Sequence, residues 1–269
     1  MTTQNAHVAK LPLGTTRAVR WMSSDGKQVE GLLLRPPGAN EHAALRTAVL
    51  LHGGPYGTRY DLGFQATTQW FVVNGWQVFM PNFRSSAGYG SAFMLRDRAD
   101  WGGQDWRDVT TGIDQLVAWG LADSTRLAVF GGSYGGYLSA WAVTQTNRFD
   151  AACVQAGISD LRLQWGISDI HRYRAFDMQG FPWEGREVYV ERSPITHVAN
   201  VKTPTLILVG SNDARTPPAN SELFYTALSA RGVPTELVRY PREGHGAREY
   251  RHRWDWNART RAWFERWVR

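Results

Sequence analysis

A single cysteine, only three lysines and the lack of any long apolar run distinguish this 269-residue sequence. The cysteine, Cys153, has no partner for a disulfide within the chain, which is typical of a reducing compartment. Apolar runs such as residues 205–210 fall far short of the ~20 residues that a membrane-spanning helix needs. Residues 1–10 are polar and lack the apolar centre of a signal peptide. These absences predict a cytoplasmic protein that does not enter a membrane.

Charged residues are also somewhat scarce, at 20% of the chain, whereas hydrophobic residues make up 43%. This is the composition of a globular protein and excludes wholesale disorder. Its length fits one large domain or two small ones. No Gly/Ser-rich linker, internal repeat or low-complexity tract divides the chain, so we expect one domain over residues 1–269. Residues 1–15 are expected to form an N-terminal extension.

The net charge is +6, and arginine supplies nearly all of the positive charge. A basic protein of this kind raises the possibility of nucleic-acid binding. The arginines are scattered, however, and no helix-turn-helix, zinc-finger or RNA-recognition pattern accompanies them. We therefore expect no nucleic-acid partner.

Strand and helix patterns alternate along most of the chain. The predicted strands are residues 29–34, 47–51, 76–80, 126–130, 151–155, 205–209 and 235–240. The predicted helices are residues 62–73, 105–119, 136–146, 221–231 and 254–268. Such alternation favours an α/β fold with a mostly parallel twisted sheet and helices on both faces. Residues 157–200 break the rhythm, and we expect them to form a short excursion over one end of the sheet.

The strongest chemical signal is the stretch Gly131-Gly132-Ser133-Tyr134-Gly135-Gly136, which lies between a predicted strand and a predicted helix. This is the context of a nucleophile elbow, a sharp turn that lifts a serine hydroxyl above the sheet. Gly131 and Gly135 allow the tight turn, where other side chains would clash. The spacing fits neither a P-loop nor a dinucleotide fingerprint. Ser133 is therefore a candidate nucleophile.

A serine hydroxyl is a weak nucleophile and needs a base, which in turn needs an acid to orient it. His245 lies between two glycines directly after the last predicted strand, where its side chain could point back over the sheet. Asp213 and Asp160 each follow a strand, and the residues alone leave both open as the acid. The chain order Ser133, Asp213, His245 is that of α/β-hydrolases.

An oxyanion hole requires a second backbone donor from an early junction between a strand and a loop. His52-Gly53-Gly54-Pro55 occupies such a junction. We expect the N–H groups of Gly54 and Tyr134 to be the donors, with the side chains of His52 and Tyr56 as alternatives. A metal-binding role for His52 is not favoured, because no second ligand stands at a suitable spacing.

Taken together, these pieces resemble the catalytic domain of the prolyl oligopeptidase family, most closely its acylaminoacyl-peptidase branch. The resemblance runs from about Thr16 to the C-terminus. The matching segments are His52-Gly53-Gly54-Pro55, residues 82–90, Trp101-Gly102-Gly103 with Asp108, Gly131 to Tyr137, residues 213–217, and Glu243-Gly244-His245-Gly246. One departure is that Ser85 or Ser86 stands where the family pattern has glycine.

The resemblance implies an α/β-hydrolase fold, a triad of Ser133, Asp213 and His245, and no cofactor or metal. It favours Asp213 over Asp160. Family peptidases usually carry a β-propeller over the active site, whereas this chain begins a few residues before the hydrolase region. We therefore expect a domain without a propeller and a more open site. The expected substrate-pocket residues are His52, Tyr56, Leu161, Trp165, Phe176 and Phe181.

The expected function is that of a serine hydrolase cleaving peptide, acyl-aminoacyl amide or carboxylic ester bonds through an acyl-enzyme. The substrate would be a small ester, a short peptide or an acyl amino acid. An acyltransferase or cyclase, in which another nucleophile replaces water, remains the alternative. A non-catalytic binding protein is disfavoured because the chain retains all three triad residues. A homo-oligomer is possible.

Overall fold

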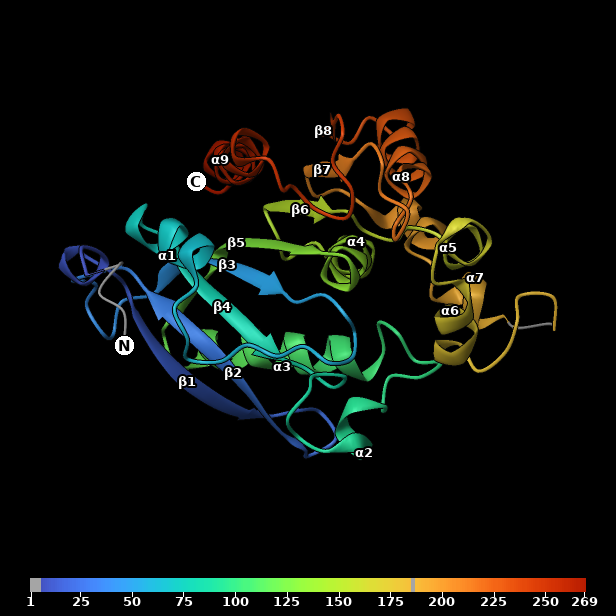
Figure 1. Cartoon of the computed structure of the whole chain (residues 1–269). Coiled ribbons are helices and arrows are strands. Elements are labelled where there is room, and N and C mark those ends of the chain that lie inside the picture. Colours follow the sequence, from blue (N-terminus) through green and yellow to red (C-terminus); the bar gives the residue numbers. More distant parts are fainter. Residues whose placement is uncertain (1–5, 185–186) are drawn as a thin grey trace.

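The computed structural model describes residues 6–184 and 187–269, which contain one eight-stranded sheet (Figure 1). The strands are β1 (Thr15–Met22), β2 (Gln28–Arg35), β3 (Leu45–Leu51), β4 (Gln77–Asn82), β5 (Ala122–Gly132), β6 (Ala151–Gln155), β7 (Thr205–Gly210) and β8 (Thr235–Tyr240). Their order across the sheet is β1-β2-β4-β3-β5-β6-β7-β8. The pairs β1–β2 and β2–β4 are antiparallel, and all other neighbouring pairs are parallel.

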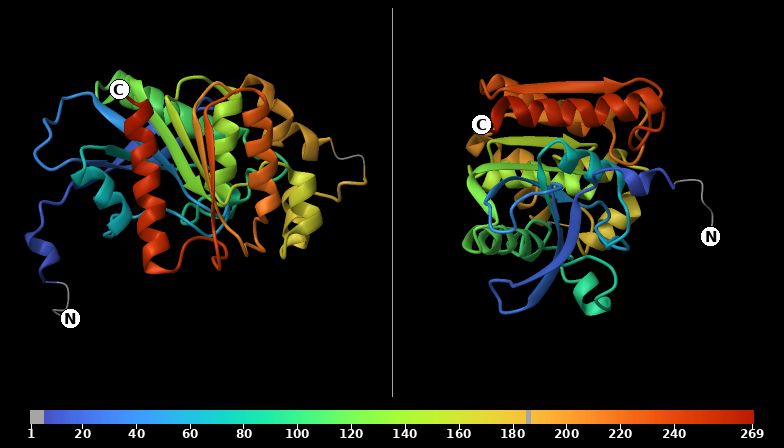
Figure 2. Two further views of the ribbon diagram at one scale, coloured as in Figure 1. Left: turned by 90° about the horizontal axis from the view of Figure 1, so that it is seen from above. Right: turned by 90° about the vertical axis from the view of Figure 1, so that its left-hand side faces the viewer.

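Helices cover both faces of this sheet, as the alternating pattern predicted (Figure 2). The α-helices are α1 (Ala66–Val73), α2 (Ser91–Met94), α3 (Gln104–Ala118), α4 (Tyr134–Gln145), α5 (Leu161–Ile167), α6 (His171–Asp177), α7 (Val188–Glu191), α8 (Pro218–Ala230) and α9 (Tyr250–Trp267). Two 3-10 helices are η1 (Val8–Lys10) and η2 (Pro194–Asn200). In the described ranges, no helix combines the length and apolar character needed to cross a membrane.

The alternation of side chains along the strands divides the core into two layers. In β3, for example, Val49 and Leu51 face the layer under α3, α4 and α8, whereas Ala48 faces the layer under α1 and α9. Aromatic rings fill the second layer, where Phe264 of α9 packs against Phe71 and Phe130 with centroid distances of 6.2 and 5.5 Å. Burial of these large rings is the main force that holds α9 on the sheet.

The fold departs from the sequence pattern at its first strand and agrees with it at the excursion after β6. Strand β1 was not predicted, because only Val19 and Trp21 of its eight residues are buried and the others face solvent or the sheet edge. The described part of residues 157–200, expected as an excursion, forms the short helices α5 to α7 and η2 beyond the carboxyl end of β6 (Figure 1). Ile158 and Arg174 from this segment line a cavity at Ser133, so the excursion borders the candidate site as expected.

A buried ion pair fixes the loop that follows β4. The Arg84 guanidinium lies between Asp108 of α3 and Asp25 of the β1–β2 turn, with 2.8 Å from Nε to Asp108 Oδ2 and 2.5 Å from Nη1 to Asp25 Oδ2. The Arg84 and Asp108 side chains are only 1% and 0% exposed. The next residue, Ser85, has a φ of 94°. This left-handed conformation favours glycine, so Ser85 rather than Ser86 occupies the position where glycine was expected.

Candidate active site

The three residues of the predicted triad lie beyond the carboxyl ends of β5, β7 and β8, at one end of the sheet. Ser133 joins β5 to α4 with a φ of 60° and a ψ of −117°, a sparsely occupied conformation for a residue with a side chain. Its N–H donates to the Gln155 carbonyl at 3.0 Å. This strand–turn–helix geometry is the one that places a serine hydroxyl above the sheet.

The two glycines of the elbow are required by close backbone approach. A Cβ at Gly135 would lie 2.0 Å from the Leu51 carbonyl oxygen, and one at Gly131 would lie 2.4 Å from the same atom. Contacts this short with backbone atoms cannot be relieved by a rotamer change. The expectation that side chains would clash at both positions is therefore confirmed.

The Asp213 carboxylate and the His245 imidazole are joined by a hydrogen bond of 2.8 Å from Nδ1 to Oδ2. The Thr216 hydroxyl lies 2.9 Å from the same oxygen, and the N–H groups of Arg215 and Thr216 donate to Oδ1 at 2.9 Å each. Burial alone would raise the pKa of Asp213, but the bonds and charge of His245 and the Thr216 donors hold that pKa below its ordinary value. Asp213 is therefore ionised and orients the imidazole.

Asp160, the other candidate acid, has a different role. Its carboxylate accepts the N–H groups of Arg162 and Leu163 at 2.8 and 3.0 Å, which makes it the N-cap of α5. Asp160 therefore caps a helix, and the carboxylate that is hydrogen-bonded to His245 is that of Asp213.

Two cavities adjoin both Ser133 and His245. The first, of about 380 Å³, extends toward Trp256 and Asn257 of α9, and we call it the α9 cavity. The second, of about 310 Å³, extends toward Gly54 and Arg174 of α6, and we call it the α6 cavity. Within the described residues, the Ser133 hydroxyl makes no hydrogen bond to His245, a contact that often tightens only when substrate binds.

The two backbone N–H groups expected to form an oxyanion hole are free to donate a hydrogen bond to a ligand. Gly54 has a φ of 129° and lines the α6 cavity with Ser133. Tyr134 is the first residue of α4, so its N–H lies at a helix N-terminus. Neither N–H has an acceptor among the residues that the structure describes. A Cβ at the adjacent Gly53 would lie 4.0 Å from Ser133 Oγ, which shows how closely this loop approaches the hydroxyl.

His52 holds the loop that carries Gly54 and does not line either cavity. The ring is 4% exposed and stacks on Phe83 at 4.2 Å. Burial lowers the pKa of His52 to about 4, so the ring is neutral near pH 7. Nδ1 lies 2.8 Å from the Gly53 carbonyl oxygen, and Nε2 lies 2.7 Å from the Ser86 hydroxyl, which donates to the Phe83 carbonyl at 2.6 Å. His52 is thus a positioning residue rather than a pocket residue.

The other five expected pocket residues also lie outside the cavity linings. Leu161 is fully buried in the core. The Tyr56 hydroxyl is buried near Asp97 and Asp177, and its ring packs edge-on against Phe176 at 6.5 Å. The rings of Trp165 and Phe181 each pack against the Trp183 ring, at a centroid distance of 4.8 Å in both pairs. The cavity walls are instead formed by residues such as Ile158, Ile170 and Gln164.

Buried carboxyl groups lie behind α4. The Tyr134 hydroxyl bonds to Asp105 and lies 3.4 Å from Asp97 Oδ2. Burial, together with the neighbouring carboxylates of Asp105 and Asp177, raises the pKa of Asp97 to about 8, and burial raises that of Asp105 to about 7. Both groups hold a proton in the folded protein at pH values where the unfolded chain has lost it.

Between the ordinary value near 4 and about pH 8, stability should therefore fall as pH rises. We expect Asp97→Asn to weaken this fall by up to about 1.4 kcal/mol per pH unit, because one proton-binding group is removed. Urea unfolding at pH 5.5 and 8 measures the effect. Asp114→Asn, on an exposed carboxylate, is the control, and equal pH dependence in the wild type and Asp97→Asn would contradict the assignment.

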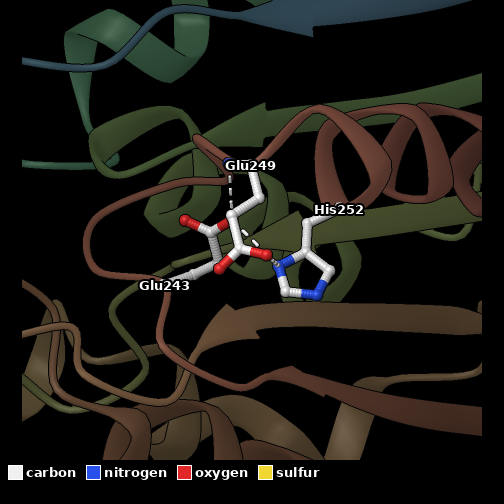
Figure 3. A group of neighbouring side chains, drawn as sticks. All are labelled: Glu243, Glu249 and His252. Atoms are coloured by element: carbon white, nitrogen blue, oxygen red, sulfur yellow. Dashed lines mark hydrogen bonds and ion pairs between the residues drawn. The ribbon is translucent and has the colours of Figure 1, made fainter.

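Glu243, Glu249 and His252 form a compact group at the start of α9 (Figure 3). Their ligand-type atoms lie within 4.8 Å of one another, an arrangement compatible with a metal ion. The Glu243 carboxylate, however, already accepts the N–H groups of Arg248 and Glu249 at 2.8 Å each and lies 2.9 Å from His252 Nδ1. These bonds close the loop that contains His245, so we assign Glu243 a positioning role.

Thr216 and Arg174 are among the residues of the site that the sequence analysis missed. Thr216 contacts both Asp213 and His245. An aspartate followed three residues later by a threonine is typical of a turn closed by side-chain-to-backbone hydrogen bonds, and this pattern could have pointed to Thr216. Arg174 lines the α6 cavity from the excursion, where no local pattern marks it.

With this geometry established, comparison with known proteins identifies the relatives of the chain. A model of the prolyl oligopeptidase family matches residues 62–269. The uncharacterized peptidase YuxL of Bacillus subtilis (strain 168) is 37% identical over 232 residues, which are 84% of this chain and 35% of that protein. Acylamino-acid-releasing enzyme 1 of Oryza sativa subsp. japonica is 32% identical over 219 residues, 77% of this chain and 28% of that protein.

Among solved structures, the acylaminoacyl peptidase of Pyrococcus horikoshii aligns with a TM-score of 0.92 and 29% identity, covering 100% of this chain and 44% of that one. The chain thus spans less than half the length of each of these relatives. The shared architecture confirms the predicted α/β-hydrolase fold. The family match over most of the chain and the likeness to acylaminoacyl peptidases show that this protein belongs to the prolyl oligopeptidase family.

Proposed function

We propose that this domain is a serine peptidase that cleaves peptide or acyl-aminoacyl bonds through a Ser133–His245–Asp213 triad. The observation that carries the proposal is the 2.8 Å bond between Asp213 and His245, at a cavity shared with a serine on a strained elbow. Family membership supports peptide chemistry, and relatives are named as acylamino-acid-releasing enzymes and dipeptidyl peptidases.

The proposed reaction proceeds in two balanced halves. Ser133 Oγ attacks the carbonyl carbon while His245 Nε2 takes the hydroxyl proton, and the N–H groups of Gly54 and Tyr134 stabilise the oxyanion. The C–N bond then breaks, His245 protonates the leaving amine, and an acyl-enzyme remains. Water, deprotonated by His245, releases the acid and restores Ser133. Asp213 stays ionised throughout and stabilises the imidazolium.

Ester substrates use the same machinery, as does acyl transfer to an amine or alcohol, so the leaving group must be tested directly. A matched panel would contain p-nitrophenyl esters of several chain lengths, N-acyl-aminoacyl p-nitroanilides and dipeptidyl p-nitroanilides with a free amino group. Ser133→Ala protein is the blank.

We expect Ser133-dependent release of nitroaniline from the N-acyl-aminoacyl compounds. Turnover of esters alone would contradict the peptidase proposal and indicate an esterase. Products that retain the acyl group on an added amine, formed in preference to the free acid, would indicate a transferase. The proposed substrates are short peptides or acyl amino acids, and a cytoplasmic location remains a prediction.

A further inference from the structure

Arg174 of α6 is a charged side chain at the wall of the α6 cavity, next to the reacting groups. Its side chain is only 3% exposed, yet it lines the same space as Ser133, His245 and Gly54. Its guanidinium carbon lies over the Trp101 ring, 4.2 Å from the ring centre. A buried arginine at this position is rigid and faces a substrate-sized space.

The hydrogen-bonding capacity of Arg174 is largely unused. Nη1 forms an ion pair with Asp177 Oδ2 at 3.0 Å, but neither Nη1 nor Nε has a hydrogen bond of good geometry to any described residue. A guanidinium carries five N–H donors, and leaving buried donors without an acceptor is costly. Nε and Nη1 are shielded from the cavity, which leaves Nη2 as the nitrogen that an acceptor on a ligand can reach.

Two other polar side chains of this wall are already engaged. The Gln164 amide donates to the Arg215 carbonyl at 2.7 Å and accepts from Asn220 at 3.0 Å. The Arg215 guanidinium turns outward to Asp169, at 2.7 Å. Ile158 and Ile170 form the apolar part of the cavity wall. Arg174 is thus the charged group of the lining that remains available for recognition.

We propose that the α6 cavity receives the side chain on the acyl side of the scissile bond, and that Arg174 selects side chains bearing a hydrogen-bond acceptor. The shared chemistry is a carbonyl or carboxylate oxygen, as in glutamine and glutamate. The ion pair with Asp177 balances part of the guanidinium charge, so a neutral carbonyl is accepted as well as an anion. This inference rests on the proposed function for its meaning in catalysis, but it can be tested by binding alone.

The test uses three N-acetyl amino acid p-nitroanilides with side chains of similar length: glutamine, glutamate and methionine. In the wild type, we expect kcat/KM for glutamine, glutamate or both to exceed that for methionine. In Arg174→Met, the preferred substrates should lose about 10- to 100-fold in kcat/KM, while the methionine compound changes by less than about threefold. Arg172→Met, an exposed neighbour on the same helix, is the matched control.

Binding of the corresponding N-acetyl amino acid amides to Ser133→Ala protein, measured by calorimetry, gives the same comparison without turnover. The double variant Arg174→Met/Asp177→Asn removes both charges and keeps the test valid should the single variant leave Asp177 buried alone and misfold. Loss confined to glutamate assigns a carboxylate ligand, and loss for both assigns a general acceptor.

Equal losses for all three compounds, or a wild-type preference for methionine in both turnover and binding, would overturn the role of Arg174. Failure of the proposed function would look different. It would show as no Ser133-dependent turnover of any compound, while the binding preference and its dependence on Arg174 persisted.

Discussion

Replacement of Ser133 by alanine is expected to lower the turnover of every substrate by about 100,000-fold or more, because the attacking oxygen is lost while the fold is kept. The Ser133→Ala variant should fold with little change. The backbone at this position is strained, but alanine adds no atoms and experiences the same strain as serine. Initial rates with the best N-acyl-aminoacyl anilide measure the effect. Calorimetric melting checks that the variant is folded.

Replacement of the proposed triad acid, Asp213, should also lower turnover, and the chain offers a matched control for it. Asp213→Asn should lower kcat by about 10,000-fold, because asparagine cannot hold the His245 tautomer in which Nδ1 is the donor. Asp160→Asn is the matched control, since Asp160 caps α5 and asparagine is an equally good cap. An Asp213→Asn variant within tenfold of the wild type, or a larger loss in Asp160→Asn, would contradict the assignment.

The second large effect is on stability and concerns Arg84. We expect Arg84→Met to lower the free energy of unfolding by about 3–5 kcal/mol, because Asp108 would remain buried without its partner. Asp108→Asn should have a similar effect by leaving the guanidinium partly unpaired. Urea unfolding followed by tryptophan fluorescence measures the change.

Arg148→Met removes a pair at the surface and serves as the control. The Arg148–Asp114 distance is 2.8 Å, but the Asp114 side chain is 65% exposed, so a change of at most about 1 kcal/mol is expected. Comparable losses in the two arginine variants would show that burial of the Arg84–Asp108 pair has no special importance.

The sequence predicted the central strands well because they are buried on both faces and therefore read as apolar, β-branched runs. Strand β6, for instance, has the predicted bounds, residues 151–155. Strand β1 escaped because an antiparallel edge strand needs few buried side chains, here Val19 and Trp21. The predicted start of α1 at residue 62 was four residues early, since apolar periodicity does not define where a helix begins.

The triad candidates could be proposed from sequence because each belongs to a short local pattern that follows a strand. The pocket could not, because its wall depends on how α5 and α6 pack against distant loops. Leu161 illustrates the difficulty, since an apolar residue in the excursion fits a pocket and a core equally well until packing places it. Arg174 could not be predicted for the opposite reason. An arginine in a charged segment is expected at the surface, and nothing in the sequence indicates that this one is buried.

The packing of α9 has a consequence for how the chain folds. Phe264 and Trp263 complete an aromatic layer in which Phe71, Trp76 and Phe130 lie more than 130 residues earlier. That layer stays open to solvent until α9 docks, so its closure depends on contacts of very long sequence separation, which form slowly. The elbow at Ser133 is local and can form early, whereas His245 reaches it only with the segment that leads into α9. Catalytic competence should therefore be among the last properties to appear during folding.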